Sequence, residues 1–235
     1  MQKRAARPSA SALVLVIALA GTGALANRAE HRPVAVRPVM DYTPPPAGSY
    51  ALHVIQRTPE GRVVGADGRL HDLSGYMRGR ITLLSLIYTY CTEPTGCALA
   101  YETSVELRKR VLADRRLRGR ARFVSLSFDP LNDTHAAMQA YGGAYARNGQ
   151  DLPWHFLTTR SMHDLKPILD GFDQEIEFEL DARGRPLRTI SHLLKLFLID
   201  REGRVREIYS TAFLHPEAML NDIRTLVMEE DAGRH

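Results

Sequence analysis

Cysteine and tryptophan are scarce in this sequence, which has two cysteines and one tryptophan in 235 residues. Hydrophobic residues make up 44% of the chain and charged residues 25%, and a globular chain of this length buries a sufficient core without disulfide bonds. The cysteines are therefore not needed to hold a small fold together. A phosphate-binding loop, a His-Glu-x-x-His motif and a nucleophile elbow are absent, which argues against P-loop NTPases, zincin metalloproteases and α/β-hydrolases.

A strong excess of charge is also absent from most of the chain. The formal net charge is +4, but Lys3, Arg4 and Arg7 lie within the first ten residues, and residues 1–26 contain no acid. Without these three cations, 28 of the 31 Lys and Arg side chains remain against all 27 Asp and Glu side chains. The folded part is thus nearly neutral, which argues against nucleic acid as a partner.

Only the N-terminal region has the pattern of a targeting segment. The three cations precede an apolar run from Ala10 to Leu19 and an Ala24-Leu25-Ala26 cleavage signal, as in an export signal peptide. The whole apolar span of residues 10–26 is at the short limit for crossing a bilayer, so a retained anchor in the inner membrane stays open. In either case, the body is predicted to lie on the periplasmic, oxidising side.

Proline enrichment marks the boundary between this segment and the domain. Residues 27–49 contain five prolines and little apolar periodicity, which is typical of an extended linker. We therefore expect a signal peptide or membrane anchor over 1–26, a proline-rich linker over 27–49 and one domain over 50–230. The domain is expected to begin with a β-hairpin in which residues 52–55 and 62–64 flank a turn at Thr58–Gly61.

Strands and helices alternate through the domain. The apolar run that starts at Leu83 predicts a buried strand, and the periodic segment Ala98–Ala113 predicts a helix after it. Further strands are expected at 122–128, 154–158, 193–199 and 205–209. Further helices are expected from a cap at Asp133 or Thr134 through Tyr145, from Ser161 to Leu169, and from Pro216 onward. Residues 172–188 are polar and are expected to form an insertion or a loose hairpin.

Both cysteines fall in the loop between the first core strand and the first core helix. Helix N-terminal N–H groups favour a thiolate there, and the thiolate is the form that binds metals and exchanges disulfides. Strand–helix alternation that ends in a hairpin and a last helix, with cysteines at the first helix, is the layout of a thioredoxin-like α/β fold. Cys91 and Cys97 are therefore candidates for a soft-metal site, a redox pair or an inert disulfide.

Four ordered motifs resemble those of the Sco/SenC family of membrane-tethered copper proteins that help to assemble cytochrome c oxidase. The resemblance covers roughly residues 50–228 and implies that His192 is a third metal ligand beside the two cysteines. The family pattern has three residues between its cysteines and a proline beside each, whereas five residues separate Cys91 from Cys97 here. The motifs are Tyr88-Thr89-Tyr90-Cys91, the segment Ser125–Pro130 with Asp133-Thr134, the strand Trp154–Thr158, and Ser191-His192 with Leu198-Ile199-Asp200 and Gly203.

The resemblance implies one copper ion per chain, as Cu(I) or Cu(II), held by Cys91, Cys97 and His192. His192 is expected on a loop or strand start that faces the cysteines. It implies a metallochaperone whose partner is the copper subunit of cytochrome c oxidase or another copper- or thiol-exchange protein. The same ligands would also suit zinc. Disulfide exchange through the two cysteines, as in a periplasmic thiol-disulfide oxidoreductase, is the alternative function. The neighbouring pair Met162-His163 is a weaker rival for a copper ligand.

Overall fold

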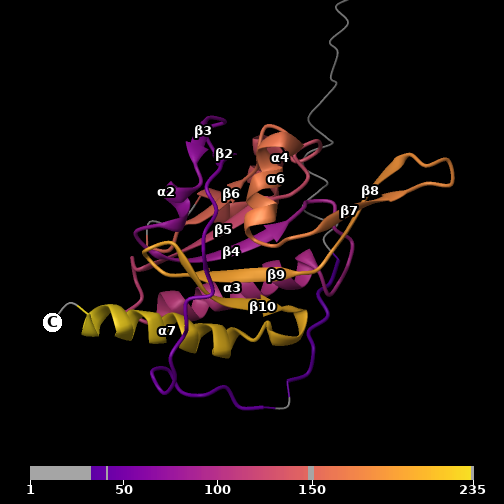
Figure 1. Cartoon of the computed structure of the whole chain (residues 1–235). Helices are drawn as coiled ribbons and strands as arrows, with labels where there is room; N and C mark the ends of the chain where they lie inside the picture. Colours follow the sequence, from indigo (N-terminus) through magenta and orange to yellow (C-terminus); the bar gives the residue numbers. More distant parts are fainter. Residues whose placement is uncertain (1–32, 41, 148–150, 234–235) are drawn as a thin grey trace, which may run out of the picture.

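A six-stranded mixed sheet forms the centre of this computed structural model, which describes residues 33–40, 42–147 and 151–233 (Figure 1). The strand order is β1-β10-β9-β4-β5-β6. The middle strands β4 (Ile81–Ile87) and β5 (Ala121–Ser127) are parallel and buried along their whole length. Continuous apolar runs form such strands because helices cover both faces of the sheet. The sheet is completed by β1 (Gln56–Arg57), β6 (Trp154–Leu157), β9 (Lys195–Ile199) and β10 (Arg204–Ser210).

Helices cover the two faces of this sheet (Figure 1). The long helices α3 (Cys97–Ala113) and α7 (Pro216–Ala232) pack side by side on one face, while α4 (His135–Gly142) and α6 (Met162–Gly171) lie toward the other. The predicted thioredoxin-like layout is confirmed, with each core element within a few residues of its expected place. The short helices are α2 (Ser74–Met77), α5 (Ala144–Arg147) and the 3₁₀ turn η1 (Thr211–Phe213).

The N-terminal hairpin is made from strands other than those we expected. The predicted pairing of residues 52–55 with 62–64 is wrong, because β1 pairs with β10 at the edge of the main sheet. The hairpin instead joins β2 (Arg62–Val64) to β3 (Leu70–Asp72). Its turn contains Gly68 at φ 71°, a backbone conformation that glycine adopts without a steric cost. The hairpin therefore turns at Asp67-Gly68 and not at Thr58–Gly61.

A glycine also shortened one predicted helix. The helix from Thr134 to Tyr145 is split into α4 and α5 at Gly143, which has φ 55° and ψ −124°. The Thr134 hydroxyl accepts a hydrogen bond from the Ala137 N–H at 3.2 Å, so Thr134 rather than Asp133 is the N-cap. Asp133 is thereby left available for another role.

The polar segment after α6 forms a two-stranded arm that projects from the body (Figure 1). The arm consists of β7 (Ile176–Leu180) and β8 (Pro186–His192), which pair antiparallel with each other and with no other strand among the described residues. The loose-hairpin prediction is confirmed. The strand that was expected from Leu193 begins two residues later, as β9.

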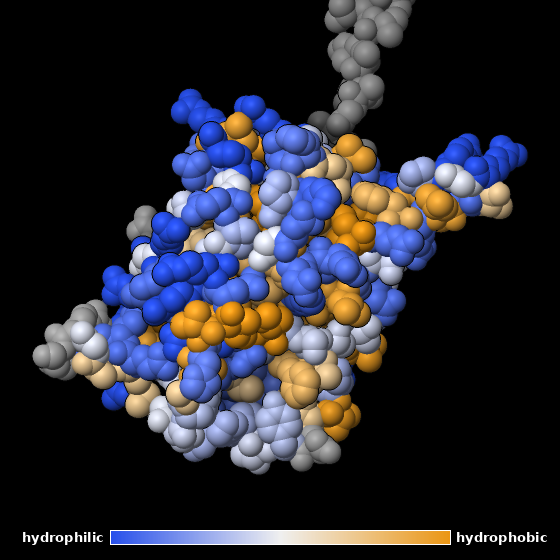
Figure 2. All heavy atoms as spheres, viewed as in Figure 1, coloured by the Kyte–Doolittle hydropathy of each residue, from blue (hydrophilic) through white to orange (hydrophobic). Residues whose placement is uncertain are grey.

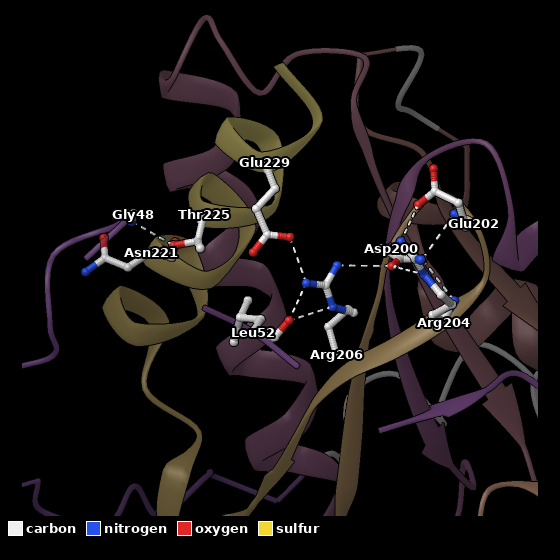
Figure 3. Close-up of polar contacts among 9 residues, drawn as sticks. All are labelled: Gly48, Leu52, Asp200, Glu202, Arg204, Arg206, Asn221, Thr225 and Glu229. Atoms are coloured by element: carbon white, nitrogen blue, oxygen red, sulfur yellow. Dashed lines mark hydrogen bonds and ion pairs between the residues drawn. The ribbon is translucent and has the colours of Figure 1, made fainter. Parts of the chain in front are cut away.

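The described part of the predicted linker contacts the domain. The Gly48 N–H donates to the Thr225 hydroxyl at 2.9 Å (Figure 3). The Asn221 amide donates to the Pro45 carbonyl at 2.9 Å. Residues 45–48 are thus fastened to α7. None of the described helices is long and apolar enough to span a membrane, and the predicted signal or anchor lies outside the described residues.

Arg206 connects three parts of the fold at the closing hairpin (Figure 3). Its guanidinium donates to the Leu52 carbonyl and forms ion pairs with Asp200 at 3.1 Å and Glu229 at 2.7 Å. Asp200 also accepts from the Arg204 N–H at 2.9 Å within the turn between β9 and β10. The chain entering the domain, this turn and the end of α7 are therefore held by one side chain.

Candidate metal centre

Cys91 and Cys97 lie on either side of the junction between β4 and α3. Cys97 is the first residue of α3, and Cys91 follows the end of β4 by four residues. Both are free thiols and nearly buried, with 7% and 2% of their surfaces exposed. The predicted placement of both sulfurs at the first strand–helix loop is confirmed.

The five-residue loop folds back so that the sulfurs meet. The Gly96 N–H donates to the Glu93 carbonyl at 3.1 Å, which closes a turn inside the loop. A Cβ atom at position 96 would lie only 3.3 Å from Cys91 Sγ, so glycine lets this sulfur approach the start of α3. The additional residues therefore leave the thiols in hydrogen-bonding contact with each other.

Contacts from three distant segments hold this loop. The Val36 N–H donates to the Pro94 carbonyl at 3.1 Å, and the Thr211 hydroxyl donates to the Thr95 carbonyl at 3.4 Å. At the strand end, the buried Asp133 carboxylate accepts from the Thr89 N–H at 2.8 Å. The same carboxylate also accepts from the Ser127 hydroxyl at 2.6 Å. It therefore connects the chain after β4 with the end of β5, next to the cysteine loop.

His192 lies beside the cysteines, at the end of β8 rather than on a loop or strand start as expected. Its Nε2 is 4.0 Å from Cys97 Sγ, and its Nδ1 is 3.0 Å from the Ile190 carbonyl. The ring packs against Phe128 and edge-on against Tyr88, with centroid distances of 4.7 and 5.7 Å. Because the carbonyl fixes the proton on Nδ1, Nε2 keeps its lone pair directed at the thiols.

The two cysteines differ in their acidity. The pKa of Cys91 falls to about 6, chiefly because the Cys97 thiol donates to its sulfur and, further, because the Cys97 and Glu93 N–H groups and His192 stabilise the thiolate. Burial raises the pKa of Cys97 well above its usual value, and the neighbouring Cys91 thiolate adds to this effect. At neutral pH, the apo site is therefore a Cys91 thiolate that accepts from a Cys97 thiol.

The donor set and its spacing suit a soft metal ion after a small adjustment. Bond lengths of about 2.3 Å to sulfur and about 2.0 Å to nitrogen put these atoms roughly 3.5–3.7 Å apart around a shared three- or four-coordinate ion. The 4.0 Å between Cys97 Sγ and His192 Nε2 exceeds this by a few tenths of an ångström. As placed, no group of three or more His, Cys, Asp and Glu side chains in the described chain is tight enough to hold a metal.

The sequence interpretation quoted Tyr88 and Asp133 within family motifs but assigned neither a function at the site. Tyr88 is 3% exposed, accepts from the Ile190 N–H at 3.4 Å and hydrogen-bonds Cys91, so it joins the cysteine strand to the histidine strand. Asp133 was interpreted as a loop or cap residue. Its place in the second family motif and its position after a buried strand were the sequence signals available for a buried carboxylate.

The fold and the paired cysteines beside a histidine define a thioredoxin-like protein with a cysteine–histidine site. The SCO1/SenC family model matches residues 63–228. The chain therefore belongs to the SCO1/SenC family.

Solved structures share this fold at low sequence identity. A SCO1/SenC family lipoprotein from Bacillus anthracis is 20% identical with a TM-score of 0.59, covering 73% of this chain and 95% of that one. Bradyrhizobium japonicum ScoI, solved with copper bound, is 18% identical with a TM-score of 0.56, covering 72% and 98%. BsSco, described as a cytochrome c oxidase assembly protein with a disulfide switch, is 19% identical with a TM-score of 0.57, covering 76% and 98%. No curated protein matches the sequence significantly.

Proposed function

We propose that this protein is a copper-binding assembly factor that delivers copper to, or matures the copper site of, a respiratory cytochrome c oxidase. The observation that carries the proposal is the convergence of the Cys91 thiolate, Cys97 and His192 Nε2 at one end of the fold. Thiolates are the preferred ligands of Cu(I), and an imidazole completes a low-coordinate site. Family membership and the copper-bound relatives support the choice of copper over zinc.

Copper is the cargo of this site, and the protein's own groups prepare the site for it. The Cys91 thiolate offers the first bond at neutral pH, and Cys97 gives up its proton when the ion arrives. His192 is held by the Ile190 carbonyl with its free nitrogen toward the sulfurs. A site with only three ligands leaves room for a partner's ligand to enter, so copper can move by ligand exchange.

The test is an anaerobic titration of the reduced full-length protein with Cu(I) against a chelator. We expect one Cu(I) per chain, loss of tight binding in Cys91→Ala and Cys97→Ala, and weaker binding in His192→Ala. His163→Ala is the matched control, because it removes the imidazole of the rival Met162-His163 pair, and its affinity should be unchanged. Unchanged affinity in both cysteine variants would refute the copper site.

A thiol-disulfide oxidoreductase is the second candidate, and the difference in acidity between the two cysteines favours it. In this reaction, the Cys91 thiolate attacks a partner's disulfide and forms a mixed disulfide, releasing one partner thiolate. Cys97 then loses its proton and attacks Cys91, which releases the second partner thiolate. The partner's disulfide is reduced by two electrons and the Cys91–Cys97 pair is oxidised. Rapid reduction of a model disulfide together with weak Cu(I) binding would select this function.

We also infer that the domain lies outside the cytoplasm, as a periplasmic protein or on a tether to the inner membrane. The support is the basic segment, apolar run and Ala-x-Ala signal of residues 1–26. Fractionation of a native host tests this, with N-terminal sequencing to distinguish cleavage from anchoring. Full-length protein with an intact N-terminus in the soluble cytoplasm would contradict export.

A further inference from the structure

A groove of about 1040 Å³ lies at the root of the projecting arm, next to the candidate metal centre. It is bounded by α6, by β7 and by the residues where β8 leads into β9, and His192 forms part of its wall. Figure 2 shows hydrophobic residues among hydrophilic ones where the arm leaves the body. A segment bound in this groove would therefore pass directly beside the imidazole of the site.

The charges of this groove are mostly neutralised in pairs, except along β7. Lys166 pairs with Asp170 at 2.7 Å, and Lys195 lies 3.8 Å from Asp173. Within the described chain, the remaining charged groups that line the groove, the carboxylates of Glu175 and Glu177, have no ion-pair partner. The groove thus has an excess of negative charge at the start of β7, from Glu177 and from Glu175 just before the strand.

A buried acceptor in the same groove is also unsatisfied. Gln174 lines the groove and is 5% exposed, and its amide nitrogen donates to the Glu175 and Leu193 carbonyls at 3.0 and 3.1 Å. Its Oε1 is buried and has no hydrogen-bond partner among the described residues. A buried acceptor left in this state costs free energy, so the Gln174 side chain is a locally unfavourable part of the groove wall.

The free edge of β7 provides a template for an extended segment. Side chains from both faces of the strand, Ile176 and Phe178 on one and Glu177 on the other, line the groove, so the groove follows the strand edge. β8 occupies the opposite edge, and no strand in the described structure pairs with the groove-side edge. Such an edge can accept an added strand through its backbone groups.

We propose that this groove docks an extended segment of the protein with which the site exchanges copper or thiols, a segment in which cationic and apolar side chains alternate. The proposal rests on the proposed function for the identity of that partner. The carboxylates of Glu175 and Glu177 pair with the cations. The apolar side chains pack on Ile176, Phe178 and Leu193. The docked segment brings the partner's ligands to His192.

The charge pattern of β7 favours such a partner over a second copy of this chain. Glu177 on β7 and Glu175, the residue just before this strand, are two positions apart and so project toward the same side. Two β7 edges paired with each other would bring these carboxylates together, which is unfavourable. A segment with cations at every second position satisfies the same pattern.

The experiment uses labelled six-residue peptides and reduced, copper-free full-length protein in a nonionic detergent. The probe alternates lysine with valine, and its matched controls alternate glutamate or serine with valine. Fluorescence anisotropy at low and high salt measures binding to the wild type, to the double variant Glu175→Gln/Glu177→Gln and to Glu102→Gln. Glu102 is an exposed carboxylate on α3 outside the groove and serves as the control position.

We expect only the lysine peptide to bind, with an affinity that falls as salt rises. The double variant should bind it about tenfold more weakly, since two partly exposed ion pairs contribute roughly 0.5–1 kcal/mol each. Glu102→Gln should bind like the wild type. In NMR spectra, the His192 imidazole signals should move on peptide addition, while those of the exposed His53 should not.

Three outcomes would overturn the proposal. These are equal binding of the glutamate peptide, a lysine-peptide affinity unaffected by the double variant, and a dimer of this chain that the double variant dissociates. The last would assign the groove to a second copy. The peptide assay uses copper-free protein, so its result does not depend on the Cu(I) titration. Either measurement can give a negative result while the other gives a positive one. The docking proposal and the proposed function are therefore tested separately.

Discussion

At the scale of single residues, the two cysteines differ in acidity although they have the same side chain. Cys91 receives hydrogen bonds from the Cys97 thiol and from two N–H groups, whereas Cys97 is buried with the charge of Cys91 beside it. The Cys91 sulfur is thus mostly a thiolate at neutral pH, whereas the Cys97 sulfur keeps its proton. The asymmetry arises from burial and from the direction of the hydrogen bonds rather than from the spacing of the cysteines.

This asymmetry predicts a pH profile for thiol alkylation in the reduced, copper-free protein. The rate with iodoacetamide should rise with pH and reach half its plateau near pH 6, because the pKa of Cys91 is lowered to about 6 and only the thiolate reacts. Cys97→Ala should move this midpoint upward, because it removes the thiol that donates to the Cys91 sulfur. Cys91→Ser should abolish the alkylation step with a midpoint near pH 6. A midpoint at pH 8 or above in the wild type would contradict the lowered pKa of Cys91.

At the scale of elements, the chain entering the domain is locked to the last helix by one buried carboxylate. Asp222 on α7 accepts from the Tyr209 phenol at 2.7 Å and from the Tyr50 phenol on the entering segment. Tyr209 is 3% exposed and Asp222 is 8% exposed, so water does not supply the hydrogen bonds of either side chain. This pairing joins β10, α7 and the residues that follow the proline-rich segment.

Removing this carboxylate should destabilise the protein more than removing one of its donors. Asp222→Ala leaves two phenols without an acceptor and should lower the free energy of unfolding by about 2–4 kcal/mol. Tyr50→Phe removes one donor and should cost about 0.5–1.5 kcal/mol. Urea denaturation monitored by circular dichroism measures both values, with the exposed Asp72→Ala as a control within about 0.5 kcal/mol of the wild type. Equal losses in the first two variants would show that Asp222 does not act as the shared acceptor.

At the scale of the whole molecule, the half-buried His155 makes the free energy of unfolding depend on pH. His155 on β6 packs against Tyr76, and burial lowers its pKa to about 4, with Arg122 and Arg80 adding to the effect. Its folded-state pKa therefore lies below the unfolded value of about 6.5. As the pH falls from 6.5 to 4, the unfolded chain takes up this proton first, so stability falls.

His155 should account for a defined part of the acid sensitivity. Between pH 7 and pH 4.5, this group alone should remove about 2–3 kcal/mol from the free energy of unfolding. His155→Gln should lose that much less stability than the wild type over the same interval, as measured by urea titration at each pH. His53→Gln, at an exposed position, should follow the wild type. A parallel loss in His155→Gln would mean that other groups carry the dependence.

The sequence by itself determined the order of the core elements and the place of the two cysteines. Buried parallel strands such as β4 and β5 are continuous apolar runs, and helices such as α7 begin at recognisable signals like Pro216, so both can be read locally. The ordered motifs around Cys91, Ser125 and His192 were enough to predict the family. Each of these signals is contained within a few neighbouring residues.

Only the tertiary structure decided which segments meet. The pairing of β1 with β10, the contact of the Val36 N–H with the Pro94 carbonyl, and the contact of His192 with Cys97 join residues far apart in the chain. Asp133, Tyr88 and Gln174 gained their significance the same way, because their neighbours come from other strands. Periodicity and turn residues describe what each segment prefers. Which partners bury a carboxylate or leave an amide unsatisfied depends on long-range packing, for which a single sequence carries no local signal.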